Sequence, residues 1–253
     1  MGSKTALANR AASLPKPSAE YTVRDQERMT LATNYFQWQS RLVEPLVGRR
    51  VLEIGCGLGN FTKHLLDREQ VVGIDIEPPC VDRWKASFAG RNNLAGSVMD
   101  VQDPRFVELK EYKPDTVVCL NVLEHIEDDR LALEHMNAVL PVGGRALLIV
   151  PAFESLYGPI DHNLGHYRRY SKRPFMELAE SIGFRAKVRY LNMPGCLGWW
   201  VNAKILKKTE QSDSQIRLFD SVIVPIISRL ESLVHPPFGQ SLFAVLEKVA
   251  SRQ

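Results

Sequence analysis

The 253-residue sequence is poor in several features that would point to particular classes of protein. Its four cysteines show no Cys-x-x-Cys spacing, which argues against a zinc ribbon or a disulfide framework and favours a reducing, cytoplasmic setting. It has no run of 18 apolar residues and no apolar stretch near its start, so we expect neither a transmembrane span nor a secretory signal. The net charge is only +3 and no basic stripe alternates with aromatic residues, so nucleic acid is not an expected partner.

The composition that remains, 45% apolar and 24% charged residues, is that of a globular protein. Residues 1–24 carry no helical stripe, and we expect a mobile leader there, followed by a single domain over residues 25–253. Within that domain, apolar strands alternate with helical stretches, which predicts a mostly parallel sheet covered on both faces. The helices are expected over residues 25–47, 60–69, 81–90, 129–144 and 172–184.

The strongest motif is VLEIGCGLGNFT, residues 51–62, in which a buried strand runs into a glycine-rich turn. Glycines there let the backbone approach a ligand closely. Asp75 ends the next strand about twenty residues later, where a carboxylate can accept hydrogen bonds from both ribose hydroxyls. This spacing also fits a nicotinamide dinucleotide. However, Glu53 would repel a pyrophosphate, and the third glycine comes one residue too early for G-x-G-x-x-G, so a ligand without phosphate is favoured.

Together with VVGIDIE, SVMDVQD, PDTVVCLNVLEHIED and LPVGGRALLIVPA, this motif resembles the successive motifs of class I S-adenosylmethionine-dependent methyltransferases over residues 48–152. The resemblance implies an α/β, Rossmann-like, seven-stranded and mostly parallel sheet with its last strand antiparallel, and closing strands near 185–193 and 240–249. It implies S-adenosylmethionine as the cofactor, and it leaves residues 153–240 for a lid and an acceptor-specificity region. The implied cofactor-binding residues are Glu53, Gly55, Cys56, Gly57, Gly59, Asp75, Ile76, Asp100, Val101, Leu120 and Asn121.

Methyl transfer needs in-line placement and, for some acceptors, a base. His125, in NVLEHIED after the fourth strand, is one candidate base, although the loop histidine could equally be structural. The ubiquinone-pathway O-methyltransferases carry an acidic residue before the Glu-His pair, proposed to hold a divalent cation. This sequence has Asn121 in that place, so we predict no metal site.

The stretch DHNLGHYRRY, residues 161–170, follows the fifth strand and is expected to form a lid over the acceptor. Its two histidines, His162 and His166, are four residues apart, would share one face of a helix, and are further candidate bases. Its arginines are expected to bind an anionic acceptor or, alternatively, to pair with surface carboxylates or with Glu154 and Asp161. The candidate substrate-binding residues are Tyr35, which could close the pocket from the first helix, with Tyr167, Arg168 and Trp199.

An apolar helix is expected over residues 216–234, with Pro225 kinking or restarting it. Its stripe consists of Ile216, Phe219, Ile223, Ile226, Leu230 and Leu233. The sequence leaves four roles open for this helix: packing on the sheet, covering a hydrophobic acceptor, contacting a second copy in a homodimer, or touching a membrane surface.

The function that these patterns favour is transfer of a methyl group from S-adenosylmethionine to a small organic acceptor, hydrophobic or anionic. O-methylation is favoured because imidazoles near the sulfonium suit deprotonation of a hydroxyl. Methylation of nitrogen or carbon stays open. The alternatives from other classes are a non-catalytic S-adenosylmethionine-binding regulator and, less well supported, a dinucleotide oxidoreductase.

Overall fold

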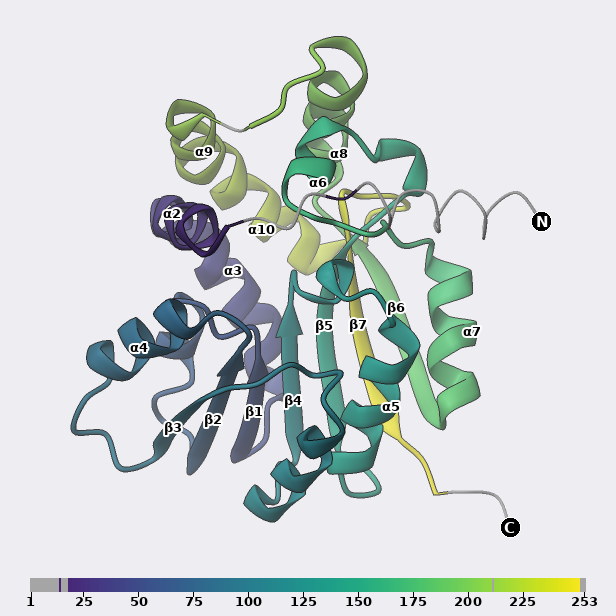
Figure 1. Cartoon of the computed structure of the whole chain (residues 1–253). Helices are drawn as coiled ribbons and strands as arrows, with labels where there is room; N and C mark the ends of the chain where they lie inside the picture. Colours follow the sequence, from purple (N-terminus) through teal and green to yellow (C-terminus); the bar gives the residue numbers. More distant parts are fainter. Residues whose placement is uncertain (1–13, 15–17, 211, 251–253) are drawn as a thin grey trace.

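The computed structural model describes residue 14, residues 18–210 and residues 212–250, and its centre is a seven-stranded sheet (Figure 1). The strand order is β3-β2-β1-β4-β5-β7-β6, and β7 runs antiparallel to both of its neighbours, as the resemblance implied. The strands are β1 (Arg50–Ile54), β2 (Gln70–Asp75), β3 (Leu94–Val98), β4 (Thr116–Leu120), β5 (Arg145–Pro151), β6 (Phe184–Leu191) and β7 (Ser241–Lys248).

Helices cover both faces of this sheet, and the alternation of side chains along each strand builds one core on each face. On one face α5 (Asp129–Val139) and α7 (Lys172–Ile182) pack against side chains such as Leu52 and Leu148. On the other face α3 (Thr33–Val43) and α10 (Val224–Leu233) pack against side chains such as Val51 and Leu147. The remaining α-helices are α2 (Ala19–Met29), α4 (Pro78–Ser87), α6 (Pro159–Asn163), α8 (Met193–Trp200) and α9 (Asp213–Leu218).

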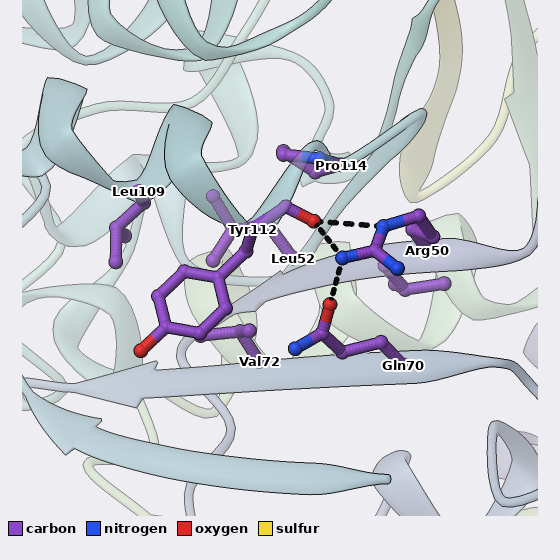
Figure 2. A pocket seen from close by; sticks show the side chains of 8 residues that line it. Arg50, Leu52, Gln70, Val72, Leu109, Tyr112 and Pro114 are labelled. Carbon is purple, nitrogen blue, oxygen red and sulfur yellow. Dashed lines mark hydrogen bonds between the residues drawn. The ribbon is translucent and has the colours of Figure 1, made fainter.

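A small hollow lies at the amino ends of β1 and β2, where Figure 2 shows the side chains that line it. The Arg50 guanidinium donates hydrogen bonds to the carbonyl oxygen of Tyr112 and to the amide oxygen of Gln70. Parallel sheets of this kind bind ligands at the carboxyl ends of their strands. The hollow therefore lies at the wrong edge for a functional site of this fold.

The N-terminal helical region differs from the prediction. The helix expected over residues 25–47 is two helices, α2 and α3, with a break at residues 30–32, and α2 begins at Ala19, inside the stretch expected to be a leader. Ser18 caps α2, because its side-chain oxygen accepts a hydrogen bond from the amide of Tyr21. Residues 1–13 and 15–17 of the expected leader lie outside the described residues.

Two other predicted helices also differ. The segment 60–69 contains only a 3-10 helix at Thr62–His64. The stripe expected over residues 216–234 divides at Pro225, which lies in the first turn of α10 directly after a π-helix at Phe219–Ile223. Only part of that stripe faces the core: Phe219 and Ile223 pack inward, while Ile226, Leu230 and Leu233 are exposed. In the described part of the chain no helix is long and apolar enough to cross a bilayer.

Candidate functional site

The glycine turn after β1 meets the end of β2 at the carboxyl edge of the sheet, where the Asp75 carboxylate organises the backbone. One carboxylate oxygen accepts a hydrogen bond from the Gly57 amide and the other from the Glu77 amide, each at 2.9 Å. Burial raises the pKa of Asp75, and these backbone donors oppose that rise. The carboxylate is therefore fixed in orientation, with the remaining lone pairs of its oxygens available to a ligand.

The shape of this edge fits the expected cofactor. Gly57 has a left-handed backbone (φ 50°), a conformation that favours glycine, and a Cβ there would also displace the end of the Gln26 side chain of α2, whose oxygen would lie 2.6 Å away. Directly after Asp75, Ile76 is 61% exposed, which leaves an apolar side chain free to pack against a flat ring such as adenine. A carboxylate that suits ribose hydroxyls and an apolar side chain that suits an adenine ring thus lie next to each other.

Glu53, on β1 beneath the glycine turn, is a buried carboxylic acid. Its side chain accepts a 2.6 Å hydrogen bond from the Thr62 hydroxyl, which in turn accepts one from the indole of Trp84. Burial raises the pKa of Glu53 to about 8, although the hydrogen bond from Thr62 acts in the opposite direction. A cationic ligand above the turn would stabilise the carboxylate form, whereas a pyrophosphate would be repelled by it.

This raised pKa predicts a dependence of stability on pH. Between pH 4.5, the ordinary pKa, and about 8, folded Glu53 holds a proton that the unfolded chain releases. The free energy of unfolding should therefore fall as the pH rises through this window, with a contribution from Glu53 of up to about 5 kcal/mol. The Glu53→Gln variant lacks this contribution. Urea unfolding of both proteins at several pH values measures it, and parallel curves would contradict the assignment.

The other predicted cofactor residues lie along the same edge of the sheet. They differ in which of their atoms a ligand could reach. The Cys56 thiol is buried against Gly73, and burial raises its pKa, so only the backbone of Cys56 can serve a ligand. Asp100 is exposed after β3, and its side chain accepts a hydrogen bond from the Gln102 amide. Val101 is buried. The assignments of these residues to the cofactor stay predictions.

The floor of the site lies after β4. Leu120 ends this strand, and Asn121 follows it with a left-handed backbone (φ 56°), a conformation that asparagine tolerates better than most residues. Tyr35 reaches this point from α3: its hydroxyl lies near the side chains of Asn121 and Ser241, and burial raises its pKa to about 12. The sequence-based expectation that Tyr35 closes the pocket is consistent with this position.

The segment between β5 and α7 forms the expected lid, and backbone hydrogen bonds fasten both of its ends. The Phe153 amide donates to the Tyr170 carbonyl oxygen at 2.9 Å, and the Tyr170 amide donates to the Pro151 carbonyl oxygen at 2.8 Å. The Tyr167 amide also donates to the carbonyl oxygen of Glu124 at 2.8 Å, which ties the lid to the loop after β4. Figure 1 shows α6, part of this lid, above the carboxyl ends of the strands.

Within the lid, His166 belongs to a buried network of charged groups. Its Nδ1 lies 2.9 Å from Oδ1 of Asp161, and Arg169 Nε donates to the same oxygen at 2.8 Å. Burial alone would raise the pKa of Asp161, but the hydrogen bond from His166 and the charge of Arg169 together lower it. The guanidinium of Arg169 stacks on the ring of Trp199, 4.6 Å from its centroid. Asp161 therefore fixes the ring of His166 and leaves Nε2 free.

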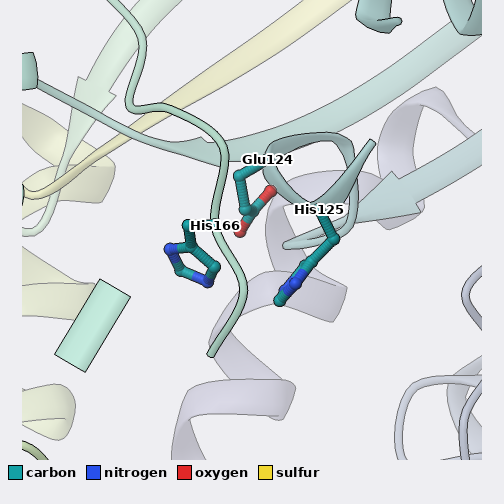
Figure 3. Close-up of side chains that lie close together, drawn as sticks. All are labelled: Glu124, His125 and His166. Atoms are coloured by element: carbon teal, nitrogen blue, oxygen red, sulfur yellow. The ribbon is translucent and has the colours of Figure 1, made fainter. Parts of the chain in front are cut away.

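His166 faces the two residues of the Glu-His pair after β4, as Figure 3 shows. The rings of His125 and His166 meet edge to face at 4.5 Å, and one ligand atom each from Glu124, His125 and His166 lies within 4.8 Å of the others. Burial raises the pKa of Glu124 to about 7, against the influence of His166 and Arg169. Part of the His125 side chain is exposed to solvent. The protein atoms packed around the ring nevertheless lower its pKa by desolvation, and the neighbouring His166 lowers it further. The buried surroundings thus favour the uncharged forms of Glu124 and His125.

This cluster has two chemical uses. Three oxygen and nitrogen ligands can hold a divalent cation with positions left open for a substrate. Alternatively, the free nitrogen of His166 can accept a proton from an acceptor. Sequence reasoning gave no metal because Asn121 replaces a carboxylate, but it did not foresee that His166 joins the Glu124–His125 pair. The absence of a metal stays a prediction.

Several lid residues are placed differently from the prediction. His162 and His166 do not share a helix face, because α6 ends at Asn163 and Gly165 (φ 75°) turns the chain before His166. Arg168 is paired with Asp129 at 2.8 Å, which matches the alternative of carboxylate pairing rather than acceptor binding. Trp199 packs in a small apolar cluster with Leu156 and Ile160 of the lid, so it supports the lid. The other members of this cluster are Cys196 and Ala203.

Helix α2 is the part of the site that sequence reasoning missed. The Asn60 side chain donates a 3.0 Å hydrogen bond to the carbonyl oxygen of Gln26, and Asp25 lies close enough to His166 for their charges to interact. This helix therefore spans from the glycine turn to the lid. Its charged sequence gave no apolar stripe, and the only local signal was Ser18 as a helix cap.

Comparison with known proteins agrees with this geometry. The profile of the methyltransferase domain family matches residues 24–187. The ubiquinone biosynthesis O-methyltransferase of Idiomarina loihiensis is 28% identical over 145 residues, which cover 50% of this chain and 57% of that protein. The chain thus spans about half the length of the curated relatives it matches.

Solved structures show the same fold. A methyltransferase complex of Haloferax volcanii that contains the Trm112 methyltransferase activator gives a TM-score of 0.63 at 17% identity, covering 92% of this chain and 96% of the other. The plantazolicin methyltransferase BamL, solved with S-adenosylhomocysteine, gives 0.56 at 14% identity, covering 92% and 90%. With a domain profile over more than half of its length and the cofactor edge described above, the chain belongs to the class I S-adenosylmethionine-dependent methyltransferases.

Proposed function

We propose that this methyltransferase moves the methyl group of S-adenosylmethionine to an oxygen atom of a small organic acceptor, and that His166 removes the acceptor's proton. The observation that carries this proposal is the buried hydrogen bond between Asp161 and His166 Nδ1, at 2.9 Å. It leaves Nε2 as the free ring nitrogen beside Glu124 and His125. An amine acceptor can react as its neutral form without a base, whereas a hydroxyl benefits from one.

The chemistry divides between the cofactor and the chain. S-adenosylmethionine, when bound, supplies an electrophilic methyl group on a positively charged sulfur. His166 Nε2 takes the proton from the acceptor hydroxyl while the oxygen forms its bond to carbon, and the electrons of the broken carbon–sulfur bond stay on sulfur. Asp161 stabilises the imidazolium that results.

Two further observations support the proposal. The relative from Idiomarina loihiensis is an O-methyltransferase. His125 of the cluster is exposed, so an acceptor can reach the cluster from solvent. The cytoplasmic location expected from the sequence accords with four cysteines that are all buried and free.

The test is to identify the bond that forms. The purified protein is incubated with methyl-labelled S-adenosylmethionine and panels of phenols, alcohols, carboxylic acids and amines, and products are fragmented by mass spectrometry. We expect label on oxygen, as an ether or ester. A labelled amine or carbon product would contradict O-methylation and leave the family assignment intact.

Treatment with a chelator distinguishes the two possible uses of the cluster, proton removal by His166 and binding of a divalent cation. With His166 as the base, the rate should be unchanged after dialysis against EDTA. Loss of activity that Mg²⁺ or Zn²⁺ restores would instead show that Glu124, His125 and His166 hold a cation.

A further inference from the structure

The exposed apolar residues of the described chain are concentrated in one region. Thirteen of the eighteen large hydrophobic residues that are exposed lie between residues 193 and 238. Ten of these thirteen residues lie in two consecutive helical segments between β6 and β7, in the upper part of Figure 1. Isolated exposed apolar side chains are ordinary on protein surfaces, but their concentration on two consecutive helical segments points to a contact with another body.

The first segment runs from α8 into a π-helix at Val201–Ile205 and is apolar on both sides. One side, with Trp199 and Ala203, packs on the lid. The other side points away from the protein and carries the exposed residues Leu197, Trp200, Val201 and Ile205, with Leu206 directly after them. A helix that is apolar all round is found in protein cores or against membranes.

The second segment, from α9 to α10, repeats this arrangement. Val224 and Ile227 face the core. On the opposite side, an exposed stripe has spacings of four, four, four and three residues, which places it on one face of the helix. Its members are Leu218, Val222, Ile226, Leu230 and Leu233, the last of which is 84% exposed. We call these residues and the exposed set of the first segment the apolar surface.

The charges around the apolar surface are not balanced. Every acid between residues 193 and 234 is already bound. Arg28 pairs with Glu210 and Asp213 at 3.3 and 3.0 Å. Asp220 accepts backbone hydrogen bonds from Asn34 and Tyr35, and Glu231 accepts them from Asn192 and Met193.

The basic residues of the same region are left without such partners. In the described part of the chain, Lys207, Lys208, Arg217 and Arg229 form no ion pair. The apolar surface is therefore accompanied by uncompensated positive charge. Trp200, which belongs to the apolar surface, is 48% exposed, and tryptophan prefers the boundary between apolar and polar surroundings.

We propose that the apolar surface binds the surface of an anionic lipid bilayer. The exposed leucines, isoleucines, valines and tryptophan would enter the boundary between headgroups and acyl chains, and the lysines and arginines would lie against the headgroup charges. No helix of the described residues spans the bilayer, so this attachment is peripheral. A hydrophobic protein partner would not require the basic residues, whereas an anionic bilayer uses both features. The proposal does not depend on the acceptor or on His166.

The test is co-sedimentation of the full-length protein with vesicles of phosphatidylcholine alone and of phosphatidylcholine with phosphatidylglycerol. We expect binding to the anionic vesicles that falls as NaCl is raised, and little binding to the neutral ones. Leu230→Ser with Leu233→Ser, and separately Lys207→Glu with Lys208→Glu, should each weaken binding at least about tenfold.

Matched controls change similar residues elsewhere. Val142→Ser removes an apolar residue that is 65% exposed outside the apolar surface, and Lys110→Glu with Lys187→Glu reverses two exposed charges. Both controls should bind vesicles like the unchanged protein. Sedimentation velocity gives the oligomeric state of each variant. Equal binding by all variants would overturn the proposal, and so would a dimer that the Leu230/Leu233 variant dissociates while no protein binds vesicles.

Discussion

Replacing Asp75 with alanine is expected to weaken the binding of S-adenosylmethionine at least about 100-fold. The carboxylate accepts hydrogen bonds from the Gly57 and Glu77 amides at 2.9 Å, and we expect its remaining lone pairs to bind the ribose hydroxyls. Hydrogen bonds to a charged group are worth about 1.5–3 kcal/mol each, and two of them account for this loss. Isothermal titration calorimetry with S-adenosylmethionine, S-adenosylhomocysteine and NAD(P) measures it, and no heat is expected from the last.

Two further variants show whether the loss arises at the ribose. Asp75→Asn keeps one oxygen acceptor and should bind with intermediate affinity. Asp82→Ala removes an exposed carboxylate from α4, nearby in sequence, and should leave binding unchanged. Unchanged affinity in Asp75→Ala would show that the ribose assignment is wrong. A variant that unfolds at a lower urea concentration but still binds would assign Asp75 to the glycine turn alone.

Replacing His166 with glutamine is expected to lower kcat by about 10² to 10⁴, the usual contribution of a positioned base, with little change in cofactor affinity. His162→Gln is the matched control, because that histidine lies in the same lid but outside the cluster with Glu124 and His125. It should retain nearly full activity. Initial rates with the acceptor identified by mass spectrometry, together with calorimetry for the cofactor, provide both readouts.

Asp161→Asn distinguishes a base that is oriented by a carboxylate from a histidine that merely packs. Because Asp161 contacts His166 and not the acceptor, we assign it as a positioning residue. Its loss should lower kcat and shift the pH dependence of the rate, with KM less affected. If His166→Gln retained its rate while His125→Gln lost it, the base would be His125.

The cofactor half of the site could be predicted from the sequence, because its signals are local. The glycine turn and Asp75 each follow directly from a strand pattern, and the order of the strands places them at one edge. The sequence predicted where the lid lies, but not which of its residues come together in the folded protein. Gly165 turns the chain between His162 and His166, and the pairing of His166 with Glu124 joins positions 42 residues apart through the tertiary fold.

Helix α2 and the outer helices could not be predicted in detail for a related reason. Helix α2 is fixed by contacts that are distant in sequence, such as that of Arg28 with Glu210 and Asp213 and that of Arg83 with Glu27. In α10 the sequence correctly predicted apolar residues at helical spacing. The side of the helix that faces the core, however, contains Val224 and Ile227 rather than the members of the expected stripe. Periodicity identifies apolar faces; it does not tell which of two such faces is buried.

The position of His166 has a consequence for the order of events in catalysis. The proposed base is carried by the lid, while His125 and Glu124 belong to the loop after β4, and the Tyr167–Glu124 backbone hydrogen bond joins the two segments. On the proposed mechanism, a lid that moved to admit an acceptor would carry His166 with it. The proposal therefore restricts proton removal to the state in which the lid lies against the loop after β4.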